Sequence, residues 1–316
     1  MIEVLLKNEQ SFVHKNINEL DACQDKMISI HLVNLSEDEL KKLAKKYQLD
    51  IRPVLKADDI ELSSRYIESI QQISLNVTLP YLDSEHKILE EPAHLLLKNN
   101  VLYSILETQT EKAINLYFNH RPIDNEKYKN GEDILILFFE ILTDYYADLI
   151  ELVTKRVRKY SERIIGVKSI SEKELDNLTE INFANIQIKE CVIELQKIVL
   201  LLRKSNSIDA ENKQRLASEF NDLAFINDYV QYNFDRLDDL KENISSKIDL
   251  EQNKIMKTFT VITVCIAPPT LIAGIYGMNF ERLPELKWIY GYPFALCLMI
   301  STVLLILTFF KTKKWI

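Results

Sequence analysis

Glycine is scarce in this chain, with five among 316 residues. They form no cluster of the kind that cradles the phosphates of a nucleotide, so the sequence gives no support to nucleotide binding or ATP hydrolysis. Proline is absent between Pro122 and Pro268, and glycine is absent between Gly166 and Gly274. A long segment without these helix breakers, in which apolar residues recur at helical spacing, predicts long helices.

Cysteine and histidine are also few. The four cysteines stand without a CxxC pair, which argues against a disulfide framework and favours a reducing compartment. The five histidines are scattered and have no zinc-ligand spacing, and no catalytic constellation is present, so we expect no enzyme. The first residues, MIEVLLKNEQSF, lack the features of a secretory signal, and none is expected.

Basic residues are outnumbered over most of the chain. Residues 258–316 hold two acidic and five basic residues, a net charge of +3. Residues 1–257 hold the other 45 acids and 34 bases, a net charge of −11. Because nucleic acid requires a basic surface, we expect no nucleic-acid partner. An acidic body is compatible with attracting cations.

Residues 1–130 are predicted to form an α+β domain, which we expect in the cytoplasm. Three segments rich in β-branched residues and bounded by polar breaks predict strands: Met27–Val33, Ile73–Leu79 and Val101–Leu106. Ser36 as N-cap, with Glu39 at the capping-box position, predicts a helix that continues through Tyr47.

Residues 131–257 are predicted to form the long helices of a stalk. The apolar spacing predicts helices over 132–163, 171–205 and 209–276, with breaks near Gly166 and Ser205. An ordinary helical bundle explains the first two equally well. The third differs because it continues into an apolar segment without a break.

Two uncharged segments of 23 residues follow, Thr258–Phe280 and Trp288–Phe310. At a rise of about 1.5 Å per residue each spans roughly 34 Å, enough to cross the ~30 Å hydrocarbon core of a bilayer. We therefore predict transmembrane helices over 258–280 and 288–310, joined by an extracytoplasmic loop over 281–287.

The lysines indicate the orientation of this hairpin. Lysines flank its two outer ends, and residues 311–316 form a basic tail, whereas the charges of the loop cancel. The positive-inside rule then puts both termini in the cytoplasm and the loop outside. The loop carboxylates are Glu281 and Glu285, and the lysines of the basic collar at the tail are Lys311, Lys313 and Lys314.

One helical face of the first apolar segment carries mostly small or hydroxylated side chains. We call this face the polar stripe; its members are Asn253, Met256, Thr260, Thr263, Ala267, Thr270, Gly274 and Gly277. It fits either close packing between helices or a ring of helices that lines a water path, and periodicity alone does not separate the two. Pro268 and Pro269 predict a kink or a loss of helical hydrogen bonds.

The run Tyr276-Gly277-Met278-Asn279-Phe280 closes the first apolar segment, and the sequence LPEL follows at residues 283–286. This arrangement resembles the CorA family of magnesium and cobalt transporters, whose mark is YGMNF at the end of the first of two C-terminal membrane helices. The similarity is close over residues 240–316 and only architectural before them. The departures from the usual family residues are Phe259, Ala267, Pro269 and Leu283.

The resemblance implies a homopentameric funnel in the cell membrane and a passive, potential-driven flow of divalent cations. The cation would be chiefly Mg²⁺, with Co²⁺ or Ni²⁺ as further candidates. Gly277, Met278 and Asn279 would form the selectivity filter. The pore-lining residues would be Asn253, Met256, Phe259, Thr260, Thr263, Ala267 and Thr270.

The chemistry of magnesium suits an asparagine at the filter. Mg²⁺ gives up its water reluctantly and prefers octahedral oxygen coordination. A ring of Asn279 amides accepts hydrogen bonds from the hydrated ion, whereas carboxylates would bind it too tightly for conduction. A helix C-cap is the alternative role for Asn279.

The resemblance also implies feedback by cytoplasmic Mg²⁺ bound between protomers. The candidate ligands are Asp235, Asp238 and Asp239. A solvated helix face explains the same three residues, and Asp58 and Asp59 in the N-terminal domain are alternative ligands.

Two other functions compete with magnesium transport. One is a zinc transporter of the same fold, but the methionine of the Gly-Met-Asn run and the LPEL loop favour magnesium. The other is a membrane-anchored helical scaffold without transport, which gives no reason for the polar stripe or for YGMNF. Metal-dependent flux in liposomes would separate these hypotheses.

Overall fold

The computed structural model spans the whole chain and describes residues 1–7, 9, 12–15, 20, 26–55, 65–120, 127–166, 170–278, 288–313 and 315. These residues form two compact units. The first consists of Met1–Ile165 and Glu172–Asp239, and the second of Gly166–Ser171 and Leu240–Ile316.

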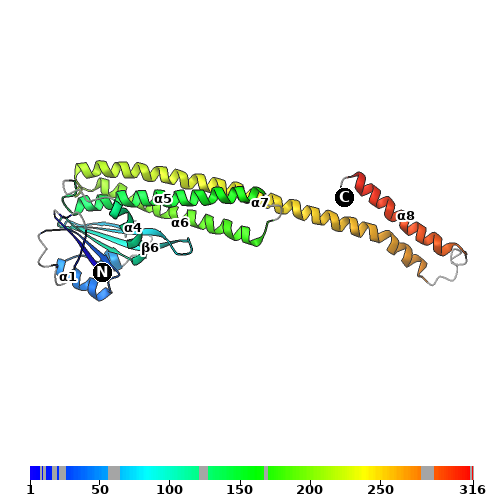
Figure 1. Cartoon of the computed structure of the whole chain (residues 1–316), viewed down its shortest axis with the longest axis horizontal. Coiled ribbons are helices and arrows are strands. Elements are labelled where there is room, and N and C mark those ends of the chain that lie inside the picture. The colour runs from blue at the N-terminus through cyan, green and yellow to red at the C-terminus, as the bar shows by residue number, and fades with distance from the viewer. Residues whose placement is uncertain are drawn as a thin grey trace. The chain divides into compact units, whose positions relative to one another are not determined.

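A mixed seven-stranded sheet forms the centre of the first unit (Figure 1). Its spatial order is β2-β1-β3-β7-β6-β5-β4; β3 and β7 pair in parallel, and the other neighbours pair antiparallel. The predicted strands 27–33 and 101–106 are confirmed to the residue, and the predicted strand 73–79 lies within β5. The strands are β1 (Ile2–Leu6), β2 (Val13–His14), β3 (Met27–Val33), β4 (Tyr66–Glu68), β5 (Gln72–Leu82), β6 (Ile88–Lys98) and β7 (Val101–Leu106).

Helix α1 (Glu37–Tyr47) packs on one face of the sheet. The predicted capping box is present: Glu39 N donates to Ser36 Oγ at 3.4 Å, and Ser36 N donates to Glu39 Oε2 at 3.0 Å. The apolar face of α1 presents Leu43 to a cluster that includes Ile30 of β3. The N-cap thus sets where the helix begins, and its spacing sets which face is buried.

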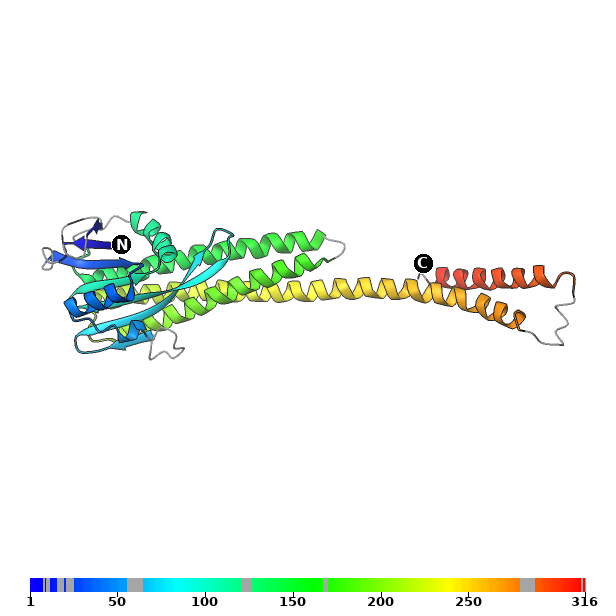
Figure 2. The same cartoon turned by 90° about the horizontal axis from the view of Figure 1, so that it is seen from below.

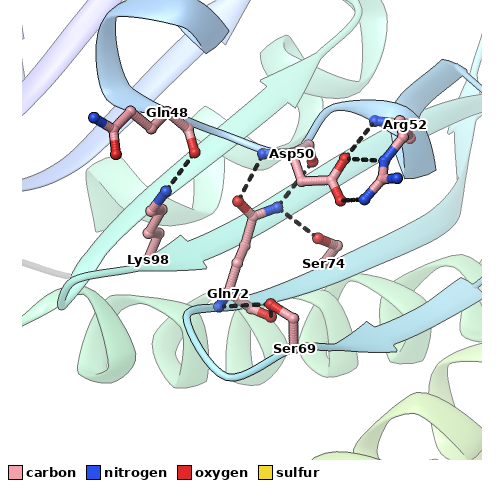
Figure 3. A network of polar contacts seen from close by, with 7 residues as sticks. All are labelled: Gln48, Asp50, Arg52, Ser69, Gln72, Ser74 and Lys98. Carbon is pink, nitrogen blue, oxygen red and sulfur yellow. Dashed lines mark hydrogen bonds and ion pairs between the residues drawn. The ribbon is translucent and has the colours of Figure 1, made fainter.

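A polar network fastens the segment after α1 to the sheet (Figure 3). The side chain of Gln72 accepts from Asp50 N at 2.9 Å and donates to Asp50 O at 2.9 Å and to Ser74 Oγ at 2.8 Å. Lys98 Nζ donates to Gln48 O. These bonds satisfy backbone groups of the connection that leads into the short helix α2 (Arg52–Leu55).

Four helices lie on the other side of the sheet in this unit. They are α4 (Thr108–His120), α5 (Gly131–Gly166), α6 (Glu172–Lys204) and the first part of α7 (Ala210–Tyr276). In the first unit α5, α6 and α7 lie side by side (Figures 1 and 2). The predicted helices 132–163, 171–205 and 209–276 are therefore confirmed, with ends that differ by at most three residues.

A buried polar layer joins these three long helices. Asn233 Nδ2 of α7 donates to Thr154 Oγ1 of α5 at 3.0 Å and to Asn185 Oδ1 of α6 at 3.3 Å. Asn185 Nδ2 in turn donates to Val230 O at 3.1 Å, and both asparagines are fully buried. Because these hydrogen bonds form only when the helices are in register, the layer specifies their alignment. It does so at a cost in stability, since Asn233 Oδ1 is buried without a hydrogen-bond partner among the described residues.

The second unit contains the last part of α7 and the helix α8 (Gly291–Thr312). Helix α7 continues through Pro268 and Pro269 to Tyr276. Helix α8 begins three residues after the start of the predicted segment 288–310 and ends two residues after its end.

Candidate functional site

The polar stripe lies on the surface of α7 in the second unit. Met256 and Phe259 are each 63% exposed, and the other predicted pore-lining residues are exposed except Thr260, which is half-buried. In the most apolar 18-residue stretch of α7 only 6% of the residues are buried, and in that of α8 only 11% are buried. A core helix of a soluble protein is mostly buried, so these two helices require apolar surroundings, and both are long enough to cross a membrane.

The threonine hydroxyls of the stripe have a defined orientation. Each donates to the carbonyl four residues earlier: Thr260 to Met256 O at 2.8 Å, Thr263 to Phe259 O at 2.9 Å, and Thr270 to Ile266 O at 2.9 Å. Since a hydroxyl has a single proton, this donation leaves its oxygen with only acceptor capacity toward the outside. The stripe therefore presents acceptors over about 15 Å of helix. A hydrated cation, whose waters point their hydrogens outward, complements such a surface.

The two prolines change the backbone beside the stripe. Proline has no N–H, so Pro268 and Pro269 remove the amide donors of the Val264 and Cys265 carbonyls within a continuous helix. The hydroxyl of Thr270 goes to the next carbonyl, that of Ile266. The carbonyls of Val264 and Cys265 thus become available to water or to a neighbouring helix, as carbonyls at a membrane helix break require.

Gly277 follows the last residue of α7 and is exposed. Its N–H donates to Ala273 O at 2.9 Å, and a Cβ at this position would lie 3.0 Å from the same oxygen. Met278 follows, half exposed. The structure thus positions the first two residues of the predicted filter; Asn279 lies outside the described residues, as do Glu281 and Glu285 of the loop.

The three predicted regulatory aspartates are exposed on α7 of the first unit. They are Asp235, Asp238 and Asp239. Asp235 Oδ1 accepts from Gln231 Nε2 at 3.0 Å. Among the described residues, no group of three or more His, Cys, Asp or Glu side chains is arranged to hold a metal ion within one chain. Asp58 and Asp59, the alternative ligands, lie outside the described part of the chain.

Sequence reasoning missed a carboxylate cluster between α5 and α7. Burial, reinforced by the charges of Glu140, Asp222 and Asp144, raises the pKa of Glu219 from 4.5 to about 7, although a hydrogen bond with Thr143 partly opposes this. Glu140 is paired with the guanidinium of Arg215 at 2.8 Å. Each acid looks like part of a solvated face in the sequence, and only the packing of the two helices brings them together.

A second group of carboxylates lies between α6 and the sheet. Glu194 accepts from Arg65 Nη1 at 2.9 Å and from Thr78 N at 2.8 Å, which fastens α6 to β5. Burial raises the pKa of Glu194 even though Arg65 opposes the shift, and burial together with the charge of Glu190 raises the pKa of Glu90. These side chains line a cavity of about 520 Å³.

Trp315 of the basic tail packs against both helices of the second unit. Lys311 and Lys313 are exposed, and Lys314 lies outside the described residues. Trp315 N donates to Phe310 O at 3.0 Å, and the Lys257 ammonium lies 5.9 Å from the centre of the Trp315 ring. The tail therefore contacts α7 as well as α8.

The comparisons with known proteins agree along the chain. A family model described as CorA-like Mg²⁺ transporter protein matches residues 24–314. A magnesium transport protein CorA of Wolinella succinogenes is 31% identical over 324 residues, and that of Helicobacter pylori strain 26695 is 28% identical over 322 residues; both matches cover 100% of each chain. The complete structure of the CorA magnesium transporter from Methanocaldococcus jannaschii has a TM-score of 0.79 at 18% identity, covering 100% of this chain and 98% of the other. This likeness confirms the predicted fold class.

Proposed function

This chain belongs to the family of CorA-like Mg²⁺ transporter proteins, and on that premise we propose that it carries Mg²⁺ passively across the cell membrane. The membrane potential supplies the driving force. At about 2.3 kcal/mol per charge and 100 mV, a divalent cation gains about 4.6 kcal/mol on entry. No resident cofactor takes part: Mg²⁺ is the cargo and, in addition, the regulator.

The observation that carries the proposal is the polar stripe of α7, with its hydroxyl oxygens turned outward as acceptors. One copy exposes this face next to large apolar side chains. Five copies around an axis, as a homopentamer, would enclose the stripe and leave the apolar faces to lipid and to α8. Gly277, Met278 and Asn279 would then end each pore helix as the filter, with the Asn279 amides accepting hydrogen bonds from hydrated Mg²⁺.

Both chain ends lie in the cytoplasm in this proposal, and the loop 281–287 faces outward. The lysines at the ends of the hairpin support this orientation. Reporter tags at residue 1 and residue 316 should both report cytoplasm, and a tag within the loop should report the outside. An external C-terminus would refute the hairpin.

Cytoplasmic Mg²⁺ regulates the pore in this proposal through the exposed aspartates of α7. Bound between protomers, the ion would neutralise carboxylates that repel one another within a Debye length of about 8 Å. Its loss would let protomers separate and widen an apolar narrowing at Met256 and Phe259, both exposed in the single chain. The ion can shift this equilibrium only by binding the closed state more tightly.

Metal uptake into liposomes that contain the purified chain tests the function. Thr263→Val removes a stripe acceptor at nearly constant shape. Thr258→Val is the matched control, because Thr258 also donates to the carbonyl four residues earlier but lies about 140° around the helix from Thr263. We expect Thr263→Val to slow Mg²⁺ uptake at least fivefold, roughly the factor for 1 kcal/mol, and Thr258→Val to leave it within twofold.

Asn279→Ala tests the filter in the same liposomes and should abolish uptake in chains that still assemble. Normal uptake by assembled Asn279→Ala would remove the filter from the proposal. A chain that conducts no Mg²⁺, Co²⁺, Ni²⁺ or Zn²⁺ at any potential would instead favour the scaffold.

A further inference from the structure

The end of the hairpin that carries the tail concentrates positive charge. Residues 252–280 and 288–316 contain five lysines and no aspartate or glutamate. Four of the lysines are described by the structure, and all four are exposed; we call them the hairpin-end lysines, and they are Lys254, Lys257, Lys311 and Lys313. The side chains of these segments therefore supply no carboxylate, and the nearest acid along α7 is Glu251, three residues before Lys254.

The fold of the tail brings lysines of both helices together. Lys313 N donates to Phe309 O at 3.1 Å and Trp315 N to Phe310 O at 3.0 Å, so Trp315 is held against the last turn of α8. The Trp315 ring packs 5.4 Å from the Phe310 ring, and the Lys257 ammonium of α7 lies 5.9 Å from the Trp315 ring centre. Lys257 of α7 and the end of α8 thus share one surface built around an indole.

The depth of this surface in a bilayer follows from the length of α8. Its 22 residues span about 33 Å, close to the thickness of the hydrocarbon core. Trp288 and Tyr290 lie before its first residue and Trp315 after its last, the two positions of an interfacial aromatic belt. With Trp315 at the boundary of the acyl chains, the hairpin-end lysines lie at the level of the lipid phosphates, where lysine side chains extend.

We propose that the hairpin-end lysines and Trp315 form a binding site for the headgroups of anionic phospholipids. Each lysine near such a surface favours an anionic lipid by a factor of about five. The indole lies where the glycerol backbone and upper acyl chain of the same lipid pack. The inference rests on membrane insertion of α7 and α8 and is independent of what the pore conducts.

The two tryptophans of the chain make the site measurable. Trp288→Phe leaves Trp315 as the sole tryptophan, and Trp315→Phe leaves Trp288 at the opposite end of α8. The full-length chain is reconstituted in phosphatidylcholine bilayers in two series. One series contains a rising fraction of brominated phosphatidylglycerol, and the other a rising fraction of brominated phosphatidylcholine. Bromine quenches only a tryptophan in contact with that lipid, so the two quenching curves give the relative affinity at each end.

We expect Trp315 to prefer phosphatidylglycerol over phosphatidylcholine at least fivefold, and Trp288 to show no preference. Lys313→Gln, which changes an exposed side chain outside the indole contacts, should lower the preference of Trp315 about fivefold. Inorganic phosphate at 10 mM should not change the curves. Equal quenching by both lipids at Trp315, an unchanged preference in Lys313→Gln, or loss of the preference in phosphate would each overturn the lipid site.

Discussion

Replacement of Glu219 by glutamine should stabilise the first unit, and more at neutral and alkaline pH than at acidic pH. Glu219 lies among other carboxylates, and its pKa is raised to about 7 from an ordinary 4.5. Between these two pH values the folded chain binds more protons than the unfolded chain, so stability falls as pH rises through this window. Glutamine carries no charge and removes that loss.

The size of the effect follows from the same two values. The pKa difference corresponds to about 3 kcal/mol. Because Glu219 is partly exposed, solvent screening reduces this to about 1–2 kcal/mol. The gain should be about a quarter of its full size at pH 5 and complete at pH 8. For a unit of this size, it should raise the midpoint of thermal unfolding by about 3 °C or more at pH 8.

Circular dichroism of the full-length chain in detergent, with heating at pH 5 and pH 8, measures both midpoints. Glu140→Gln is the matched control in the same cluster. Glu140 pairs with Arg215 at 2.8 Å, and the two side chains are 15% and 17% exposed, so this change should destabilise by about 2 kcal/mol. Two neighbouring carboxylates should therefore respond in opposite directions. A lower midpoint for Glu219→Gln at pH 8, or an equal gain at pH 5, would refute the reasoning.

Three further outcomes are expected. Arg65→Met leaves Glu194 buried without its cation, so hydrogen exchange of the β5 amides should rise by a factor equivalent to about 3 kcal/mol at pH 7.5. Because burial raises the pKa of Glu194, the rise caused by the substitution should be smaller at pH 5, and an equal rise at both pH values would contradict this. Gly277→Ala should block Mg²⁺ uptake, because a Cβ at this position would lie 3.0 Å from Ala273 O; normal uptake by assembled Gly277→Ala would argue against the crowding. Replacement of the three exposed aspartates Asp235, Asp238 and Asp239 by asparagine should weaken the inhibition of the current by internal Mg²⁺ in patch recordings. Unchanged inhibition would mean that the sensor lies elsewhere in the chain.

The family could be recognised from the sequence because its mark is local: YGMNF stands at the end of an uncharged segment, and the comparisons confirm the assignment. Strands β3 and β7 were equally accessible, since each is a short run of β-branched residues between polar breaks. Strand β6 was missed because Glu90, Glu91 and Pro92 interrupt its apolar pattern. Proline lacks the amide that a central strand uses, but Pro92 pairs only with Thr78 of β5, because β7 pairs with β6 only from His94 onward.

The helical periodicity of α7 identified which residues share the polar stripe, but it did not identify the acceptors of the hydrogen bonds that their hydroxyl groups donate. The hydrogen bonds of Thr260, Thr263 and Thr270 to their own helix make the stripe an acceptor surface, a property of rotamers rather than of sequence. The cluster around Glu219 was not accessible either, since it depends on the register of α5 against α7.

That register has a consequence for how such chains change in length during evolution. Each residue inserted into a helix turns the side chains that follow it by about 100°. A single insertion within α5, α6 or α7 next to the layer of Thr154, Asn185 and Asn233 would therefore move one of these side chains away from its partners. Residues added where α5 ends and α6 begins, beyond the layer on both helices, leave the three polar side chains in place. Insertions and deletions among relatives that keep these three polar residues should therefore accumulate there, and chains that have lost the layer should be free to vary along all three helices.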